Sequence, residues 1–225
     1  MTWTPRRPGR VFSAVAFTVI GAVAALLLTA AGALPRDRER LPAAGPVDIG
    51  FSQDMIVHHQ QAVTMAQAVL GRVSPSVAQL ATGVELNQIR EIGQMQGWLN
   101  LWDAPQVSSG PAMTWMSGHQ GHGGADDSGA DDSDADDGAM PGLASVDEMN
   151  RLGELEGDDL DAYFLQLMIR HHEGGLVMTA AAARDATDPH VRAFAVIIAT
   201  EQRQETATMS GLLSALGREP LPLSG

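Results

Sequence analysis

The chain has 225 residues and a formal net charge of −13, with no cysteine and no lysine. The acidic balance argues against a nucleic-acid partner, and the missing cysteines exclude disulfides and thiolate chemistry. Neither a nucleophile-elbow motif nor a phosphate-cradling glycine loop occurs, so nucleophilic catalysis has no support in the sequence.

The N-terminal region has the pattern of a targeting segment. Three arginines precede an uncharged apolar run over residues 11–34, which is long for a signal peptide and sufficient for one membrane-spanning helix. We expect residues 1–34 to be a signal peptide or an N-terminal membrane anchor, followed by a linker over 35–46. Both alternatives predict an extracytoplasmic domain, secreted or membrane-anchored, where thioethers resist oxidation better than thiols.

The rest of the chain contains one pattern twice. Residues 55–66 read MIVHHQQAVTMA, and residues 168–180 read MIRHHEGGLVMTA. At an offset of 113, the methionines, the isoleucine and the adjacent histidines of the two stretches coincide. This internal repeat of imidazoles and thioethers is the feature on which the functional interpretation depends.

Each copy of the pattern predicts a helical hairpin. Ser74-Pro75 and Asp188-Pro189 each predict a helix start, with a capping side chain followed by proline at the first helical position. Two such hairpins predict an all-α, antiparallel four-helix bundle, in addition to an N-terminal apolar helix. The four long helices are expected at about residues 48–70, 75–101, 159–183 and 189–216.

The hairpins set the expected domain boundaries. Ser145 and Glu148 have the spacing of a capping box and predict a short helix before the third long one. The expected segments are a first hairpin over 47–104, a flexible Met/His- and Asp-rich linker over 105–144, a second hairpin over 145–217 and a tail over 218–225.

The linker contains a string of soft ligands. Met113, Met116, His119 and His122 are spaced three apart, so a flexible chain could wrap them around one soft ion. The alternative is chance spacing in a solvated linker of biased composition. The seven aspartates between residues 126 and 137 are expected to be a disordered, soluble spacer.

The repeated side chains are expected to face the bundle interior. At about 100° per residue, the histidines and methionines of the first motif share one helix stripe, and those of the second motif do the same. Glu91 and Glu205 are either ligands or acceptors that orient an imidazole through its other N–H. The candidate metal ligands are Met55, His58, His59, Met65, Met95, Met168, His171, His172, Met178 and Met209.

Imidazole and thioether together favour a soft cation, with Cu(I) first and Ag(I) or Cu(II) as alternatives. Two other interpretations remain open. The methionines could be core filler, and the histidines could form a structural network with Glu91 and Glu205. Four inward imidazoles would be costly to bury without a partner, and a metal is favoured over the two carboxylates because the accompanying ligands are soft.

These motifs make the family recognisable. The sequence resembles the exported, histidine- and methionine-rich family known as domain of unknown function 305, over essentially all of residues 47–216 apart from the acidic insert. The resemblance implies a ferritin-like four-helix bundle that binds copper, is similar to silver-binding proteins, and has no defined enzymatic role. It is carried by the stretches 51–66, 88–99, 140–142 and 164–178.

Carried over by motif, the resemblance implies ligand roles for His58, His59, Met65, His171, His172 and Met178. The chain departs from the family pattern at two places. Leu143 stands where methionine is common, and Gly174-Gly175 replaces the more usual glycine-alanine. Because Gly175 lies on the inward stripe, we expect the second site to be roomier than the first.

Three functions fit these observations. The favoured one is a non-enzymatic protein that sequesters copper or hands it on, with the metal ion, a membrane at the N-terminal segment and a copper-handling protein as partners. The second is a ferritin-like di-metal oxidase, which the absence of Glu-x-x-His pairs opposes. The third is a helical interaction module whose histidines form a pH-sensitive network.

Overall fold

The computed structural model describes residues 43–119 and 140–223, and every regular element within those ranges is helical. The expected N-terminal helix, His122 and the aspartate run lie outside them. No helix in the described ranges is both long enough and apolar enough to cross a bilayer. The helices are α2 (Pro46–Val69), α3 (Pro75–Leu101), η1 (Thr114–His119), α4 (Val146–Glu154), α5 (Gly157–Asp185) and α6 (Pro189–Ala215).

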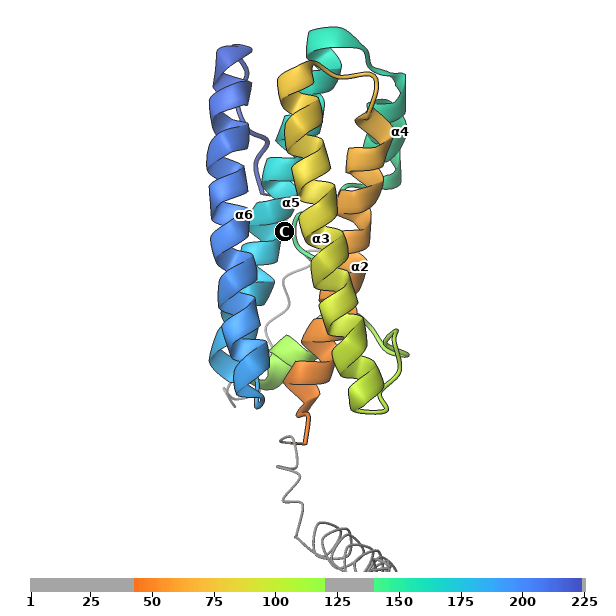
Figure 1. The fold of residues 1–225 in the computed structure, drawn as a ribbon, viewed down its shortest axis with the longest axis vertical. Coiled ribbons are helices and arrows are strands. Elements are labelled where there is room, and N and C mark those ends of the chain that lie inside the picture. The colour runs from red at the N-terminus through yellow and green to blue at the C-terminus, as the bar shows by residue number, and fades with distance from the viewer. Residues whose placement is uncertain (1–42, 120–139, 224–225) are drawn as a thin grey trace, which may run out of the picture. The chain divides into compact units, whose positions relative to one another are not determined.

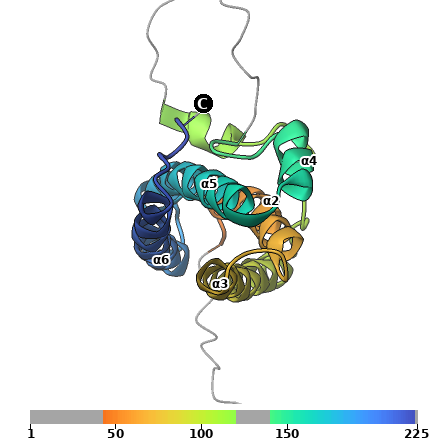
Figure 2. The same ribbon diagram turned by 90° about the horizontal axis from the view of Figure 1, so that it is seen from above.

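The four long helices form the predicted bundle (Figures 1 and 2). α2 packs along α3, α5 packs along α6, and the two hairpins meet mainly through α2 and α5. The side between α3 and α6 has far fewer contacts. The all-α four-helix prediction is therefore confirmed, and the long helices end within two residues of their expected positions.

The helix starts are capped across the bundle. The expected cap at Ser74 is absent, since its side chain makes no capping hydrogen bond. Instead, the Ser74 N–H donates to the buried Asp161 carboxylate on α5 (3.1 Å). In the other hairpin, the Asp188 N–H donates to the buried Asp48 carboxylate on α2 (3.0 Å). Each hairpin thus supplies a carboxylate to the N-terminus of the other hairpin's second helix.

The short helix α4 begins at the predicted capping box. The Ser145 side chain accepts from the Glu148 N–H, and the Glu148 carboxylate accepts from the Ser145 N–H. The same carboxylate binds the buried Arg170 guanidinium of α5 at 2.6 Å, which lowers the pKa of Glu148. This ion pair fixes α4 to the second hairpin.

A tight segment over residues 140–144 closes the bundle between α2 and α5. The Gln61 amide holds it through two hydrogen bonds with the Ala144 backbone, at 2.7 and 2.8 Å. On the other side, a Cβ at Gly174 would overlap the Pro141 carbonyl. Gly142 adopts a φ of +76° and approaches the Arg170 carbonyl. The missing side chains at both glycines allow this backbone to touch α5.

The close approach at Gly174 predicts that alanine will have opposite effects on stability at two glycines of the bundle. Gly174→Ala should lower the free energy of unfolding by about 1–3 kcal/mol, because the added methyl forces backbone segments apart. Gly93→Ala is the matched control, since no atom lies within 4 Å of its added Cβ on an exposed face of α3. It should raise stability by about 0.5–1 kcal/mol. Urea unfolding measures both, and equal effects would contradict the close approach.

Candidate metal centre

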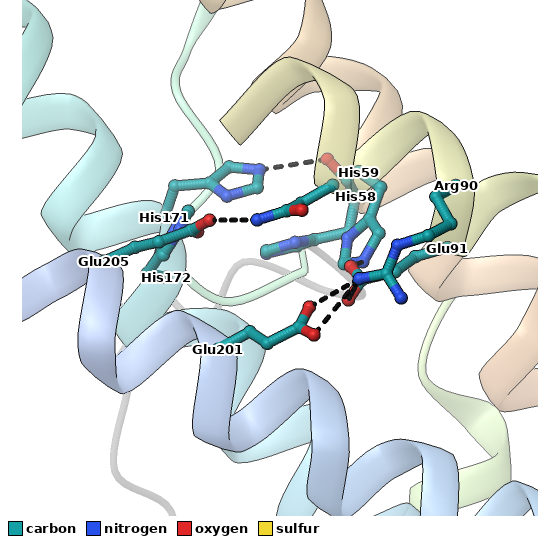
Figure 3. A network of polar contacts seen from close by, with 9 residues as sticks. His58, His59, Arg90, Glu91, His171, His172, Glu201 and Glu205 are labelled. Atoms are coloured by element: carbon teal, nitrogen blue, oxygen red, sulfur yellow. Dashed lines mark hydrogen bonds and ion pairs between the residues drawn. The ribbon is translucent and has the colours of Figure 1, made fainter. Parts of the chain in front are cut away.

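Four histidines meet at the centre of the bundle. His58 and His59 come from α2, His171 and His172 come from α5, and all four side chains are 0% exposed. The rings of His58 and His171 lie 3.9 Å apart between centroids, with His59 and His172 on either side (Figure 3). The sequence prediction that these rings point inward is confirmed, and they form one layer rather than two separate groups.

Oxygen atoms accept a hydrogen bond from one nitrogen in three of the four rings. His58 Nε2 lies 3.1 Å from the Pro141 carbonyl, and His171 Nε2 lies 2.9 Å from the His58 carbonyl. His172 Nε2 lies 2.7 Å from Oε2 of Glu205. Since carbonyl and carboxylate oxygens accept hydrogen bonds, these rings carry their proton on Nε2.

The other nitrogen of every ring is free. Nδ1 of all four histidines is buried and has no hydrogen-bond partner. With the proton on Nε2, Nδ1 of His58, His171 and His172 presents a lone pair to the interior. Buried polar atoms are normally paired, so four unpaired nitrogens in one layer need a partner of another kind. A metal ion fits this requirement.

His59 is held least well by its neighbours. Its Nε2 lies 2.8 Å from Oε2 of Glu91, yet the ring is not oriented for a hydrogen bond to that oxygen. Both nitrogens of this buried ring therefore lack an aligned partner.

Burial keeps three of the imidazoles neutral, those of His58, His59 and His171. Desolvation, followed by repulsion from neighbouring imidazoles, lowers the pKa of His58 and of His59 from 6.5 to about 3. The pKa of His171 falls well below its usual value for the same reasons. A metal binds neutral imidazole, so these rings are in the binding form at neutral pH.

The carboxylates beside the layer differ in character. Burial raises the pKa of Glu91, against the opposing effects of a hydrogen bond with Glu201 and the charge of Arg90. For Glu205, burial also acts to raise the pKa, but the hydrogen bond with His172 and other contacts outweigh it and the pKa falls.

The predicted methionines are all fully buried but are not grouped by hairpin. Because α2 and α5 run in opposite directions, the start of one motif lies beside the end of the other. Each methionine cluster therefore takes members from both hairpins. One cluster holds Met55, Met95 and Met178, and the other holds Met65, Met168 and Met209.

The start of the linker is held on the bundle rather than free. The Met113 N–H and the Trp115 indole N–H both donate to Asp54 on α2, at 2.7 and 2.8 Å. Met113 is half-buried and packs against the cluster that contains Met55. Met116 is half-buried as well. Trp115 and Asp54 anchor the start of the linker to α2, which composition alone did not predict.

The structure corrects the expectation at Gly175 and adds a buried methionine that the sequence prediction omitted. The room expected at Gly175 is absent, because the Gln202 side chain fills it and would collide with an added Cβ. Met140 was not among the candidate ligands, yet it is buried in the same cluster as Met55. Its position in the Met-Pro-Gly motif was the sequence signal that could have identified it as a candidate.

The polar seam between α3 and α6 was also missed. Asn87 donates to Glu205 at 2.8 Å, and the exposed Arg90 pairs with Glu201 at 2.8 Å (Figure 3). These contacts join helices far apart in sequence, and no local motif marks them. They fix the carboxylates that face the imidazole layer.

No three side chains of the His, Cys, Asp and Glu types are grouped as a ready-made metal site in the described ranges. The imidazole layer offers nitrogen atoms, and the adjoining clusters offer sulfur. A site here would therefore combine imidazole with thioether, which suits a soft cation.

The sequence profile of a known family, domain of unknown function 305, matches residues 48–213. The chain belongs to this family. A crystal structure of a DUF305 protein from Streptomyces coelicolor, described as proposed to be secreted, is 36% identical with a TM-score of 0.67, covering 78% of this chain and 97% of that one. A DUF305 fragment from Deinococcus radiodurans is 31% identical with a TM-score of 0.61, covering 77% and 99%.

More distant structures show the same fold in metal-bound states. CopM in its Cu(I)-bound form is 21% identical to this DUF305 protein, with a TM-score of 0.54, covering 75% of this chain and 96% of that one. CopM has also been solved in Cu(II)-bound and Ag-bound forms. No match is found among curated proteins.

The lowered histidine pKa values predict acid sensitivity in the metal-free protein. In the unfolded chain the His58 and His59 side chains titrate near 6.5, and in the folded chain near 3. Below about pH 6.5 the unfolded state binds more protons, so the free energy of unfolding should fall as pH falls. Each histidine should contribute a slope approaching about 1.4 kcal/mol per pH unit.

Urea unfolding at a series of pH values between about 7 and 5 measures this slope. His190→Gln is the control, because His190 is exposed at the start of α6 and should leave the slope unchanged. A wild-type slope near zero in this range would show that the buried imidazoles are not held neutral.

Proposed function

We propose that this DUF305 protein binds a soft metal ion, Cu(I) first and Ag(I) or Cu(II) as alternatives, and sequesters it or hands it on outside the cytoplasm. The observation that carries the proposal is the layer of four buried imidazoles whose Nδ1 atoms have no hydrogen-bond partner among the described residues. The bound forms of CopM support the choice of metals, since that protein shares the fold.

The ligands divide by chemistry. The Nδ1 atoms of His58, His59, His171 and His172 would supply nitrogen, and the two methionine clusters would supply sulfur. Met113 and Met116, with His119 and His122 further along the chain, remain candidates for an additional site. Thioethers are neutral and soft, so the set favours a monovalent ion.

Glu91 and Glu205 are better suited to orient rings than to bind the ion. Glu205 already accepts from Nε2 of His172, which leaves Nδ1 as the ligand atom. An acceptor behind a ligating imidazole fixes its orientation and increases its basicity. Carboxylate oxygen is also a poor match for a soft cation.

Location outside the cytoplasm is the second part of the proposal. The arginine-flanked apolar run over residues 11–34 supports it, together with the description of the Streptomyces coelicolor relative. A retained run would anchor the protein to a membrane, and a cleaved one would release it. A copper-handling protein would then be the natural donor or acceptor of the ion.

Metal loading tests the proposal directly. Protein purified from copper-supplemented cells should contain copper by elemental analysis, and a variant with all four histidines changed to alanine should contain much less. Circular dichroism must show that the variant remains helical. Copper no higher in the wild type than in this variant would refute the proposal.

Thermal melting separates metal binding from a purely structural histidine network. At about 100 times Kd, Ag(I) should stabilise the wild type by about 2.7 kcal/mol and raise its Tm. The milder double variant H58Q/H171Q should lose most of this gain, while H190Q should keep it. A wild-type Tm unaffected by Ag(I) or Cu(I) would favour the pH-sensitive network. Two bound irons and metal-dependent oxygen consumption would favour the di-metal oxidase.

A further inference from the structure

The segment after α3 covers one methionine cluster. It turns back along the first helix, where Gln53 on α2 donates to the Pro105 carbonyl at 2.7 Å. Trp115 lies against Gly50 and meets the Phe51 ring edge-on, with 5.8 Å between ring centroids. Figure 1 shows η1, in green, beside the first turns of α2. We call residues 105–116 the strap.

The strap brings one methionine to the edge of the cluster beneath it. Four methionines of that core cluster are buried, and the half-buried Met113 packs against the cluster. Beside it lies a surface groove of about 290 Å³, lined in part by Ser108, Thr114 and Trp115. Met113 therefore lies at the partly exposed edge of the cluster whose buried thioethers are those of Met55, Met95, Met140 and Met178.

The backbone at Met113 is held in an unfavourable conformation. Its φ is +65°, a left-handed value that a residue with a side chain rarely adopts. Asp54 stabilises this conformation by accepting from the Met113 N–H, and it also accepts from the Trp115 indole. Asp54 is 5% exposed and both bonds go to one of its oxygens. Strain maintained by a dedicated buried group is typical of functional positions.

We propose that Met113 is the capture ligand for a soft monovalent cation, and that Asp54 is the positioning residue that holds it over the buried methionines. The inference rests on the proposed metal-binding function. The ion binds the Met113 sulfur at the surface and passes to the buried thioethers. Because thioethers are neutral, each transfer exchanges one sulfur for another with no proton released and no change in oxidation state.

Kinetics with Ag(I) alone, added to the full chain, test this role. Uptake is followed by stopped-flow tryptophan fluorescence, and release is started by an excess of a small thiol. Met113→Leu keeps the size of the side chain but removes the sulfur. It should slow uptake and release alike by about tenfold or more, with stoichiometry and affinity nearly unchanged. Met149→Leu, on α4 and packed against the other core cluster, is the matched control and should behave as the wild type.

Asp54→Asn tests the positioning role. It should slow uptake as Met113→Leu does, and the double variant should be no slower than Met113→Leu alone, because both changes affect one contact. Independent, additive effects would show that Asp54 acts on the fold in general and would overturn its assigned role.

The outcomes separate the two proposals. If the wild type binds no Ag(I) at equilibrium, the proposed function itself fails. If the wild type binds Ag(I) and Met113→Leu exchanges it at the wild-type rate, the function stands and the capture role is overturned. If Met113→Leu instead lowers the number of ions bound, Met113 is a permanent ligand and the capture role is again overturned.

Discussion

The bundle depends on burying four imidazoles at its centre, where burial opposes charge on His58, His59 and His171. A protonated ring in this interior would be strongly unfavourable, and the low pKa values of His58 and His59 express that cost. The structure meets the constraint by giving Nε2 of three rings an oxygen partner and leaving Nδ1 of all four rings free. An unpaired buried nitrogen would be unfavourable in an ordinary core, but a metal ligand requires a nitrogen whose lone pair is free.

The surroundings of the layer follow from that constraint. The Pro141 carbonyl reaches His58 only because Gly174 lets the chain touch α5. Glu205 reaches His172 from α6, and Asn87 on α3 restrains it. Every long helix therefore contributes to the orientation of the rings. The two core clusters that contain the methionines add neutral, apolar side chains to the bundle interior.

Local sequence patterns predicted the helices and the inward direction of the repeated side chains. Periodicity is enough for this, since helix geometry decides which residues share a face. The hydrogen-bond partners of the ring nitrogens could not be predicted from the sequence, because Pro141 lies 83 residues from His58 and meets it only through tertiary packing. The mixing of methionines from both hairpins likewise depends on how α2 and α5 pass each other. Composition suggested a flexible linker, whereas Gln53 and Asp54 on α2 hold its first part in place.

Each hairpin supplies a carboxylate to the other, and this bears on whether a single hairpin could fold alone. Asp48 serves the helix that begins at Asp188, and Asp161 serves the helix that begins at Ser74. In a lone hairpin, the carboxylate would lose its hydrogen-bond donor on the other hairpin, and the N–H that begins the second helix would lose its acceptor. Two identical hairpins could exchange these groups as a symmetric pair. A half-length version of this architecture would therefore be expected to exist as a dimer, with its imidazole layer completed by the second copy.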